Sequence, residues 1–448
     1  MSRRVLGVLC ALAFASISAR PAVAAGGFIY SVRRGDTLSA VGARCGVSWQ
    51  KLAVYNRIAN PNRIGVGDKL LVPGVTGCQE AEAPTLRAVA AVEQVAVPAA
   101  PAPRPGGAGF GYGVQAHALG GDAQRVVDMT KGMGFNWVKQ QVEWHRHEGS
   151  KGQYDFGGLE PLVNAANAGG VNVLFSVVKA PHWARPGNTD FSVEGPPANP
   201  QDFADFMGAM AGHFRGRVKA YEIWNEQNLH YEWGNEPLSA ARYVQLLRVT
   251  YRAIKANDPG AMVISGALTP TGVNDGRLAI DDVNYLAQMY ANGLRGVCDG
   301  VGVHPSGYNN PATVRAGWTD GAEPGFKGHR SFFFRSTMES YRNVMVRYGD
   351  AGKKLWVTEF GWASTENLGA GPAAGYEYAA QNSEGEQAQR LVDAFNLARA
   401  WGYVGPMFVW NLNFAPVSGP GDEKAAFGLV RADWSPRPAY EALRDMPK

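Results

Sequence analysis

Short apolar runs alternate with stretches of helical periodicity from residue 109 to residue 448. Eight apolar runs have the length of strands, at residues 111–117, 137–144, 171–178, 220–226, 262–270, 299–308, 354–362 and 405–414. Between them, apolar residues recur at helical spacing, as in residues 123–134, 159–170, 200–214, 240–257 and 384–402. This alternation predicts an α/β fold, a (β/α)8 barrel over residues 109–448, with catalytic groups at the carboxyl ends of its parallel strands.

An open, doubly wound sheet is the alternative arrangement of the same elements. It would need a phosphate-binding glycine loop after its first strand. The glycines of GGAGFGYGV, residues 106–114, come before a strand instead, so the barrel is favoured.

The first part of the chain has a different pattern. Residues 28–74 contain a strand, two helices and a closing strand, at 28–32, 36–46, 48–56 and 68–73. Residues 75–108 are rich in Ala, Val, Pro and Glu and contain no aromatic residue. Such sequence cannot bury a core, so we predict a linker between the small module and the barrel.

The N-terminus has the pattern of a secretory signal peptide. Arg3 and Arg4 precede an apolar run over residues 5–17, and residues 22–24, AVA, form a small-x-small cleavage pattern. A membrane anchor would need a longer apolar run, whereas a twin-arginine export signal would also fit the two arginines. We expect residues 1–24 to be removed and the protein to be secreted, periplasmic or associated with the cell envelope.

Charge and cysteine content refine this picture. Of 43 Lys+Arg and 39 Asp+Glu residues, residues 1–24 hold three arginines and no acid, which leaves 40 against 39. A balance this close to neutral predicts no binding to nucleic acid or to an anionic membrane. Cys45 and Cys78 flank the small module and are the candidate disulfide of an oxidising compartment, whereas Cys298 is expected to be a buried thiol.

Two glutamates end predicted strands of the barrel. Glu226 ends the fourth strand in YEIWNEQN, residues 221–228, and Glu359 lies near the end of the seventh in WVTEFGW, residues 356–362. Two carboxylates at one barrel mouth are the minimum equipment for cleaving a glycosidic bond, because one protonates the leaving oxygen and the other attacks the sugar or activates water. A buried ion pair is the structural alternative, and it explains a pair in this aromatic-rich context less well.

These two motifs resemble those of the clan A glycoside hydrolases, and residues 135–156 and 301–308 are most similar to the branch around family 39. The resemblance implies a retaining double displacement, with Glu226 as the general acid/base and Glu359 as the nucleophile. Glu226 would need a raised pKa, supplied by an apolar wall and the second carboxylate. Asn225 would bind the sugar 2-hydroxyl, and no metal or other cofactor is implied.

Further substrate contacts are expected at strand ends, namely Lys139, His182, Trp183, His304, Tyr308 and Trp410. The resemblance implies that one of His304 and Tyr308 contacts the nucleophile or the sugar and that Trp410 stacks under the sugar ring, with a core position as the alternative for Trp410. Lys139 and Gln141 stand where many clan members have an arginine, which leaves the electrostatic support of the nucleophile open. Glu222 is interpreted as a structural group of the barrel interior, because it lies four residues before Glu226 and on the same strand face.

Two loops also contain candidate residues. The long loop over residues 307–334 is a candidate cleft wall, with Trp318 and Arg330 as possible contacts. His145, His147 and Glu148 have part of a metal-binding pattern but lack a third ligand at suitable spacing, so a loop is favoured.

The small module resembles a LysM domain over YSVRRGDTLSAVGARCGVS, residues 30–48, and LAVYNRIANPNRIGVGDKLLVP, residues 52–73. The resemblance implies binding of an N-acetylglucosamine-containing glycan, peptidoglycan or chitin-like. The groove would lie between the loop at Gly35, Asp36 and Thr37 and the loop over residues 56–64, which contains Asn60 and Ile64. Alternatively, Gly35 and Asp36 simply make a turn and cap a helix.

Together these features favour a secreted retaining glycosidase that cleaves a β-linked polysaccharide such as a xylan, a glucan or an exopolysaccharide. The LysM-like module would tether it to the glycan of a cell wall, and we expect it to act as a monomer. The alternatives are a peptidoglycan-directed glycosidase and a catalytically inactive glycan-binding protein.

Overall fold

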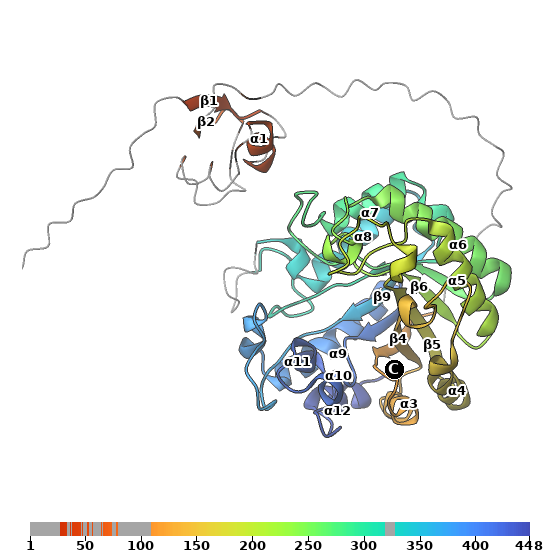
Figure 1. Cartoon of the computed structure of the whole chain (residues 1–448). Helices are drawn as coiled ribbons and strands as arrows, with labels where there is room; N and C mark the ends of the chain where they lie inside the picture. Colours follow the sequence, from red (N-terminus) through yellow and green to blue (C-terminus); the bar gives the residue numbers. More distant parts are fainter. Residues whose placement is uncertain are drawn as a thin grey trace, which may run out of the picture. The chain divides into compact units, whose positions relative to one another are not determined.

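The computed structural model describes residues 27–33, 36, 38–45, 47, 52, 56, 64, 66–73, 78, 109–318 and 328–448. The predicted signal peptide, almost all of the predicted linker and most of the predicted second helix lie outside these residues, as do Gly35, Thr37 and Asn60. The chain divides into two compact units, Met1–Val97 and Pro98–Lys448 (Figure 1).

The first unit contains a two-stranded antiparallel sheet of β1 (Gly27–Ser31) and β2 (Lys69–Pro73), with Ile29 opposite Leu71. Helix α1 (Leu38–Cys45) packs on it through a small apolar core that includes Tyr30, Leu38, Val41, Leu70 and Val72. Cys45 and Cys78 form a disulfide, so the predicted pairing is confirmed. A cross-link supplements a core this small because it restricts the unfolded chain.

The second unit is a closed barrel of eight parallel strands in sequence order. The strands are β3 (Gly111–Gln115), β4 (Trp137–Glu143), β5 (Asn172–Val178), β6 (Ala220–Ile223), β7 (Met262–Ser265), β8 (Gly300–Val303), β9 (Lys354–Phe360) and β10 (Val404–Val409). Strand β10 pairs with β3 and closes the ring. The predicted (β/α)8 barrel is therefore confirmed.

Helices surround this barrel (Figure 1). They are α3 (Ala123–Gly132), α4 (Glu160–Gly169), α5 (Pro200–His213), α6 (Ala240–Asn257), α7 (Asp282–Ala291), α8 (Phe334–Arg347) and α9 (Glu384–Trp401), followed near the C-terminus by α10 (Phe414–Ser418), α11 (Glu423–Phe427) and α12 (Pro438–Asp445). Their ends carry clear signals: Ser383 and Glu386 form a capping box before α9, and left-handed Gly402 ends it. None of the helices in the described part of the chain is long and apolar enough to cross a membrane.

The lower interior of the barrel is apolar. Its cluster, which we name the barrel floor, consists of Trp137, Leu174, Ala220, Ile264, Trp356 and Phe408. Glycines on neighbouring strands leave room for the large rings: a Cβ at Gly300 would lie 2.5 Å from the Trp356 ring, and one at Gly113 would lie 2.6 Å from the Phe408 ring. The floor thus closes the barrel below any site at its mouth.

Several strands end earlier than predicted, and the difference at the fourth strand matters most for the site. Strand β6 ends at Ile223, so Glu226 lies in the turn after the fourth strand rather than at its last position. Trp224 and Glu226 have left-handed backbone angles, with φ of 71° and 47°. Non-glycine residues adopt this conformation rarely, and it occurs often at functional sites. The turn breaks the strand alternation that had placed Glu222 and Glu226 on one face.

Candidate active site

Glu226 and Glu359 line the same cavity, of about 320 Å³. The other lining residues are Thr269, Pro270, His304, Pro305, Ser306, Tyr308, Phe360, Gly361, Gly375, Tyr376, Tyr378, Trp410 and Phe427. Most of them belong to the carboxyl ends of strands β7 to β10 or to the segments that follow. The predicted meeting of the two glutamates with His304, Tyr308 and Trp410 is therefore observed.

Backbone contacts hold the turn that carries Glu226. The Glu226 N–H donates to the Ala267 carbonyl at 2.8 Å, and the Trp224 N–H donates to the Val177 carbonyl at 3.0 Å. Asn225, between them, is 9% exposed and is not among the residues that line the cavity. Its Oδ1 accepts no hydrogen bond from the described residues. Glu359 lies within β9 itself, so the two carboxylates are held by a fixed turn and a strand.

Lys139 lies beneath the two carboxylates and not on the cavity wall. Its Nζ is 2.9 Å from Oε1 of Glu359 and 3.1 Å from Oε2 of Glu222, and its side chain is 0% exposed. The predicted contact of Lys139 with substrate is therefore wrong, because a fully buried side chain cannot reach a sugar. Instead, Lys139 places a positive charge next to Glu359. The sequence analysis had left open which residue would provide this charge in place of an arginine. Burial alone would lower the pKa of Lys139, but Glu222 and Glu359 together raise it.

His304 contacts both glutamates of the cavity. Its Nδ1 lies 3.0 Å from Oε1 of Glu226 and 3.9 Å from Oε2 of Glu359. Its Nε2 lies 3.1 Å from the hydroxyl of Thr358. Burial would lower the pKa of His304, but the negative charge of Glu359 and the hydrogen bond to Glu226 raise it. His304 is therefore poised to be a cation between two carboxylates.

The pKa of Glu226 differs from the prediction. Burial alone would raise it, as the sequence analysis expected, but the hydrogen bond and positive charge of His304 outweigh burial and lower it. The expected raised pKa is thus wrong for the ligand-free site. In that site the contact with His304 favours the ionised form of Glu226.

Only one group among the described residues has a geometry that could hold a metal ion, namely Glu226, His304 and Glu359, whose potential ligand atoms lie within 4.8 Å of one another. Two observations disfavour a cation there. Lys139 already occupies the far side of Glu359, and both ring nitrogens of His304 have partners. The cluster is better suited to moving protons than to binding a metal.

His182 and Trp183 lie in a different cavity. They line a hollow of about 560 Å³ after β5, together with His145, Arg185, Phe191 and Glu194 among others. Nε1 of Trp183 donates to the Glu148 carbonyl at 3.0 Å. The structure therefore does not bring these two residues into the cavity of Glu226 and Glu359. Glu148 in turn accepts from Trp144 and from the Gly152 N–H, which agrees with the loop interpretation of residues 145–148.

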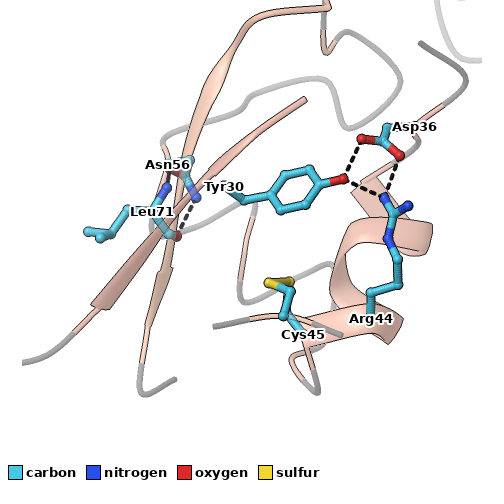
Figure 2. The surroundings of a disulfide bond; sticks show 7 residues. Tyr30, Asp36, Arg44, Cys45, Asn56 and Leu71 are labelled. Atoms are coloured by element: carbon cyan, nitrogen blue, oxygen red, sulfur yellow. Dashed lines mark hydrogen bonds and ion pairs between the residues drawn. A yellow bond between two sulfur atoms is a disulfide. The ribbon is translucent and has the colours of Figure 1, made fainter. Parts of the chain in front are cut away.

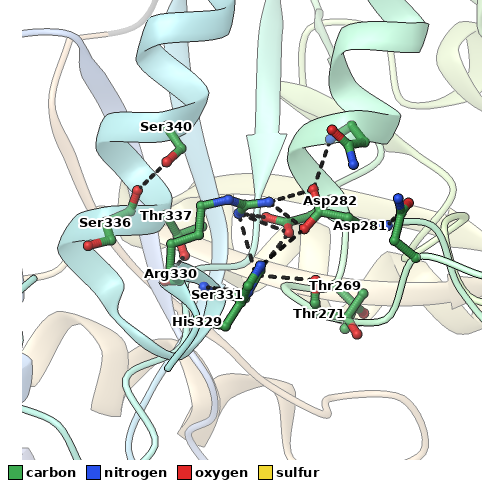
Figure 3. Close-up of polar contacts among 12 residues, drawn as sticks. Thr269, Thr271, Asp281, Asp282, His329, Arg330, Ser331, Ser336, Thr337 and Ser340 are labelled. Atoms are coloured by element: carbon green, nitrogen blue, oxygen red, sulfur yellow. Dashed lines mark hydrogen bonds and ion pairs between the residues drawn. The ribbon is translucent and has the colours of Figure 1, made fainter. Parts of the chain in front are cut away.

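Arg330 has a structural partner set instead of a place in the cavity wall. Its guanidinium pairs with Asp281 and with Asp282, which lies 3.1 Å away (Figure 3). Asp281 caps α7, so the ion pairs attach the segment before α8 to the start of α7. The interpretation of Arg330 as a cleft contact is wrong, and Trp318 is half-buried and does not line the cavity.

Several residues of the site were missed from the sequence. Thr358, Tyr376 and Phe427 have ordinary surroundings in the sequence, although Thr358 directly precedes Glu359. Glu232 lies in the short turn Tyr231–Trp233 after β6, where burial and the negative charge of Glu226 raise its pKa to about 8. Tyr376 and Phe427 reach the cavity from segments that follow β9 and β10, and no spacing rule in the sequence identifies such residues.

In the small unit, Asp36 is engaged inside the module (Figure 2). Its carboxylate accepts from the Tyr30 hydroxyl at 2.7 Å and from the Arg33 N–H at 2.7 Å, and it pairs with Arg44. Ile64 packs against the small core. These contacts are structural, and they agree with the alternative in which Asp36 stabilises a turn of the module; a glycan contact of Asp36 or Ile64 stays a prediction. Gly35, Thr37 and Asn60 lie outside the described residues.

Comparison with known proteins supports both units. Residues 30–73 match the LysM domain family, which confirms that resemblance. The structure is similar to a family 39 glycoside hydrolase from Bacteroides cellulosilyticus WH2, with a TM-score of 0.58 and 21% identity, over 75% of this chain and 63% of that one. A glucosidase from Croceicoccus marinus has a TM-score of 0.52 and 14% identity, over 75% and 66% of the two chains.

A β-glycosidase named BGL167 is also similar, with a TM-score of 0.51 and 15% identity, over 75% of this chain and 95% of that one. This chain thus spans less than two thirds of the length of the family 39 glycoside hydrolase and of the Croceicoccus marinus glucosidase. At such identities the likeness shows a shared fold, and its structural neighbours are glycoside hydrolases. Activity must be argued from the site itself.

Proposed function

We propose that the barrel is a retaining glycosidase that cleaves β-linked glycans, with Glu226 as general acid/base and Glu359 as nucleophile. The observation that carries the proposal is the proximity of these two carboxylates on one cavity. Oxygens of Glu226 and Glu359 lie within 4.8 Å of each other. Retaining glycosidases have carboxyl groups about 5–5.5 Å apart, whereas inverting enzymes need about 6.5–9.5 Å to admit a water molecule.

The two half-reactions follow from this geometry. Glu226 gives its proton to the glycosidic oxygen, whose bond to the anomeric carbon breaks as an oxygen of Glu359 bonds to that carbon. A water molecule then gives a proton to Glu226, and its oxygen displaces Glu359 from the sugar. Both carboxyl groups end as they began, and one glycosidic bond is hydrolysed.

The charges of the cavity favour a neutral substrate. Its described lining residues include two glutamates and no lysine or arginine. A uronic acid or a sulfated sugar would bring a further negative charge against them, and the one basic lining group, His304, is already engaged with Glu226. Aromatic rings of Tyr308, Tyr376 and Trp410 offer apolar surface for a sugar ring. A xylan, a neutral glucan or a neutral exopolysaccharide fits this lining.

The LysM domain adds a second glycan contact. It supports attachment of the enzyme to an N-acetylglucosamine-containing polymer, with location at the cell envelope after export. A peptidoglycan-directed glycosidase is the second candidate, because the LysM domain would then bind the same polymer that the barrel cleaves.

The test uses the purified full chain on a panel of neutral β-glycans, uronic acid polymers and peptidoglycan. Glu226→Gln and Glu359→Gln should each lower the rate at least about 10³-fold, since each removes an essential group of the displacement. Glu441→Gln, in α12 with a 41% exposed side chain, is the matched control and should keep full activity.

Proton NMR of the first product should show the β-anomer. Inversion of configuration, or full activity in both site variants, would contradict the mechanism. Cleavage of peptidoglycan alone would select the second candidate. A wild-type chain that binds glycans and cleaves none of them would mean a glycan-binding protein.

A further inference from the structure

Buried side chains connect Glu226 to the centre of the barrel. Oε1 of Glu226 lies 3.0 Å from Nδ1 of His304, and Nε2 of the same ring lies 3.1 Å from the Thr358 hydroxyl. Thr358 donates this hydroxyl hydrogen to Oε1 of Glu222 at 2.7 Å. His304 is 5% exposed, and Thr358 and Glu222 are fully buried.

The second half of the connection is an ion-pair chain. Oε2 of Glu222 lies 3.1 Å from Nζ of Lys139, which lies 2.9 Å from Oε1 of Glu359. Nζ also contacts the Thr358 carbonyl at 3.2 Å. Glu222 further accepts from the Ala267 N–H at 3.2 Å. The two glutamates of the cavity are thereby linked through buried groups, of which His304 alone among His304, Thr358, Glu222 and Lys139 also lines the cavity.

The direction of each hydrogen bond follows from donor capacity. An ammonium group only donates, and a carboxylate only accepts. Burial alone would raise the pKa of Glu222, but Lys139, His304 and the Thr358 hydroxyl lower it, so Glu222 is a carboxylate. The single hydroxyl hydrogen of Thr358 therefore points to Glu222. Its oxygen is left to accept a hydrogen from Nε2 of His304.

We propose that Lys139, Glu222 and Thr358 hold His304 in the form that carries a hydrogen on Nε2, so that Nδ1 shares one proton with Glu226. In one state Nδ1 holds this proton and faces a carboxylate. In the other, Glu226 holds it and donates to the bare Nδ1. His304 is then the positioning residue that supplies Glu226 with its proton, and Thr358 is the positioning residue that fixes the tautomer of His304. The inference rests on the proposed role of Glu226 but concerns a separate observable.

The charges around His304 permit both states. Three carboxylates face the ring: Glu222 from β6, Glu226 from the turn after β6, and Glu359 from β9. The ammonium group of Lys139 faces the ring from β4. The carboxylates favour the imidazolium in the ligand-free site. A bound sugar that excludes water would favour the neutral pair, because charges are costly in a dry cavity.

Proton transfer in the proposed step is balanced. The proton moves from Nδ1 to Glu226, which leaves a neutral imidazole and a neutral carboxylic acid. Glu226 then passes it to the leaving oxygen and becomes a carboxylate. In the second half-reaction Glu226 takes a proton from water, and this proton can return to Nδ1.

The first test needs no substrate. The full chain is labelled with 15N-histidine, and the ring signals of His304 are assigned by their loss in His304→Gln, since the chain has 8 histidines. As pH rises until the ring loses a proton, Nδ1 should become the bare nitrogen while Nε2 keeps its hydrogen. Loss of the hydrogen from Nε2 instead would overturn the proposal.

Two substitutions at one position sharpen the test. Thr358→Val removes the hydroxyl with little change of shape, and the neutral ring should then populate both tautomers. Thr358→Ser keeps the hydroxyl and should restore the Nε2–H form. Thr250→Val is the matched control, because Thr250 is also fully buried and its hydroxyl has no partner among the described residues. An unchanged tautomer in Thr358→Val would overturn the proposal.

Kinetics separate acid supply from general damage. In Thr358→Val, kcat/KM on a glycan with an alcohol leaving group should fall about 10- to 100-fold, a part of what general acid catalysis contributes. An activated aryl glycoside needs little protonation, so its kcat/KM should fall less than about threefold. Equal losses on both substrates would overturn the proposal. A wild-type chain without any glycosidase activity would sink the proposed function, while the tautomer measurement would still stand.

Discussion

The barrel interior contains two layers that the same strands supply. The floor residues Trp137, Ala220 and Trp356 are apolar. Two residues later on β4, β6 and β9 stand Lys139, Glu222 and Thr358, which we name the polar layer. Side chains of a strand alternate between faces, so both layers point into the barrel. The backbone pattern is the same, and only the side chains differ.

This difference separates stability from function. The floor gains from apolar burial and close packing, with rings set against glycines. The polar layer places charges where their loss of hydration is costly, and Lys139 compensates two carboxylates at once. In the proposed mechanism, the layer positions Glu359 and His304. We therefore expect substitutions in the polar layer to remove activity, and substitutions in the floor to lower stability while activity is kept.

The largest expected effect is that of removing the cation of the polar layer. Lys139→Met leaves Glu222 buried without its counter-charge, so the free energy of unfolding should fall by about 3–5 kcal/mol. Activity should also be lost, because Glu359 loses its support. Urea unfolding followed by tryptophan fluorescence measures the first effect. Lys151→Met, with a 61% exposed side chain, is the control and should change little. Equal stability of the two variants would contradict the comparison.

The next effect is a partial recovery. Adding Glu222→Leu to Lys139→Met removes the uncompensated buried charge, and well-packed apolar residues often replace a buried ion pair without loss. The double variant should regain at least about 2 kcal/mol over Lys139→Met and remain inactive. Urea unfolding and the glycan assay measure both properties. A double variant less stable than the single one would show that the polar layer contributes to folding in its own right.

The contrast between the layers also explains how far the sequence could predict the site. Alternating apolar runs predicted the eight strands, and the period of two already placed Glu222 inside the barrel. The left-handed turn at Trp224 and Glu226 has no such signal, because it depends on contacts with Val177 in β5 and with Ala267, which follows β7.

Electrostatics were the least predictable part. The prediction for Glu226 considered burial and the second carboxylate but not His304, whose contact reverses the direction of the pKa shift. Lys139 was expected at the barrel mouth but lies deeper. Its depth depends on how the strands are staggered around the barrel, and the sequence does not specify this stagger. Glu359 lies near the end of β9, as predicted, although the register of β9 against β10 shifts between Val357 and Phe360.

A smaller effect is expected from the floor. A Cβ at Gly300 would lie 2.5 Å from the Trp356 ring, so Gly300→Ala should lower the free energy of unfolding by about 1–3 kcal/mol through overpacking. The folded enzyme should keep its pH profile, because the polar layer is unchanged. Gly296→Ala is the control, since a Cβ there would meet nothing within 4 Å. A shifted pH profile in Gly300→Ala would show that the two layers are coupled.

The smallest effect is the pH dependence of stability from Glu226 and His304. The pKa of Glu226 is lowered on folding, so its contribution is present above about pH 4.3 and is lost as pH falls through the folded value. The pKa of His304 is raised, so its contribution is present below about pH 6.5 and is lost as pH rises through the folded value. Both contributions are full between these limits.

His304→Gln should therefore flatten the maximum of stability in that window, as measured by urea unfolding from pH 4 to pH 8, whereas Gly300→Ala should lower the curve without changing its shape. Parallel curves for wild type and His304→Gln would mean that the contact between Glu226 and His304 does not contribute to the free energy of unfolding. Of the charged groups compared, only Lys139 would then contribute to it.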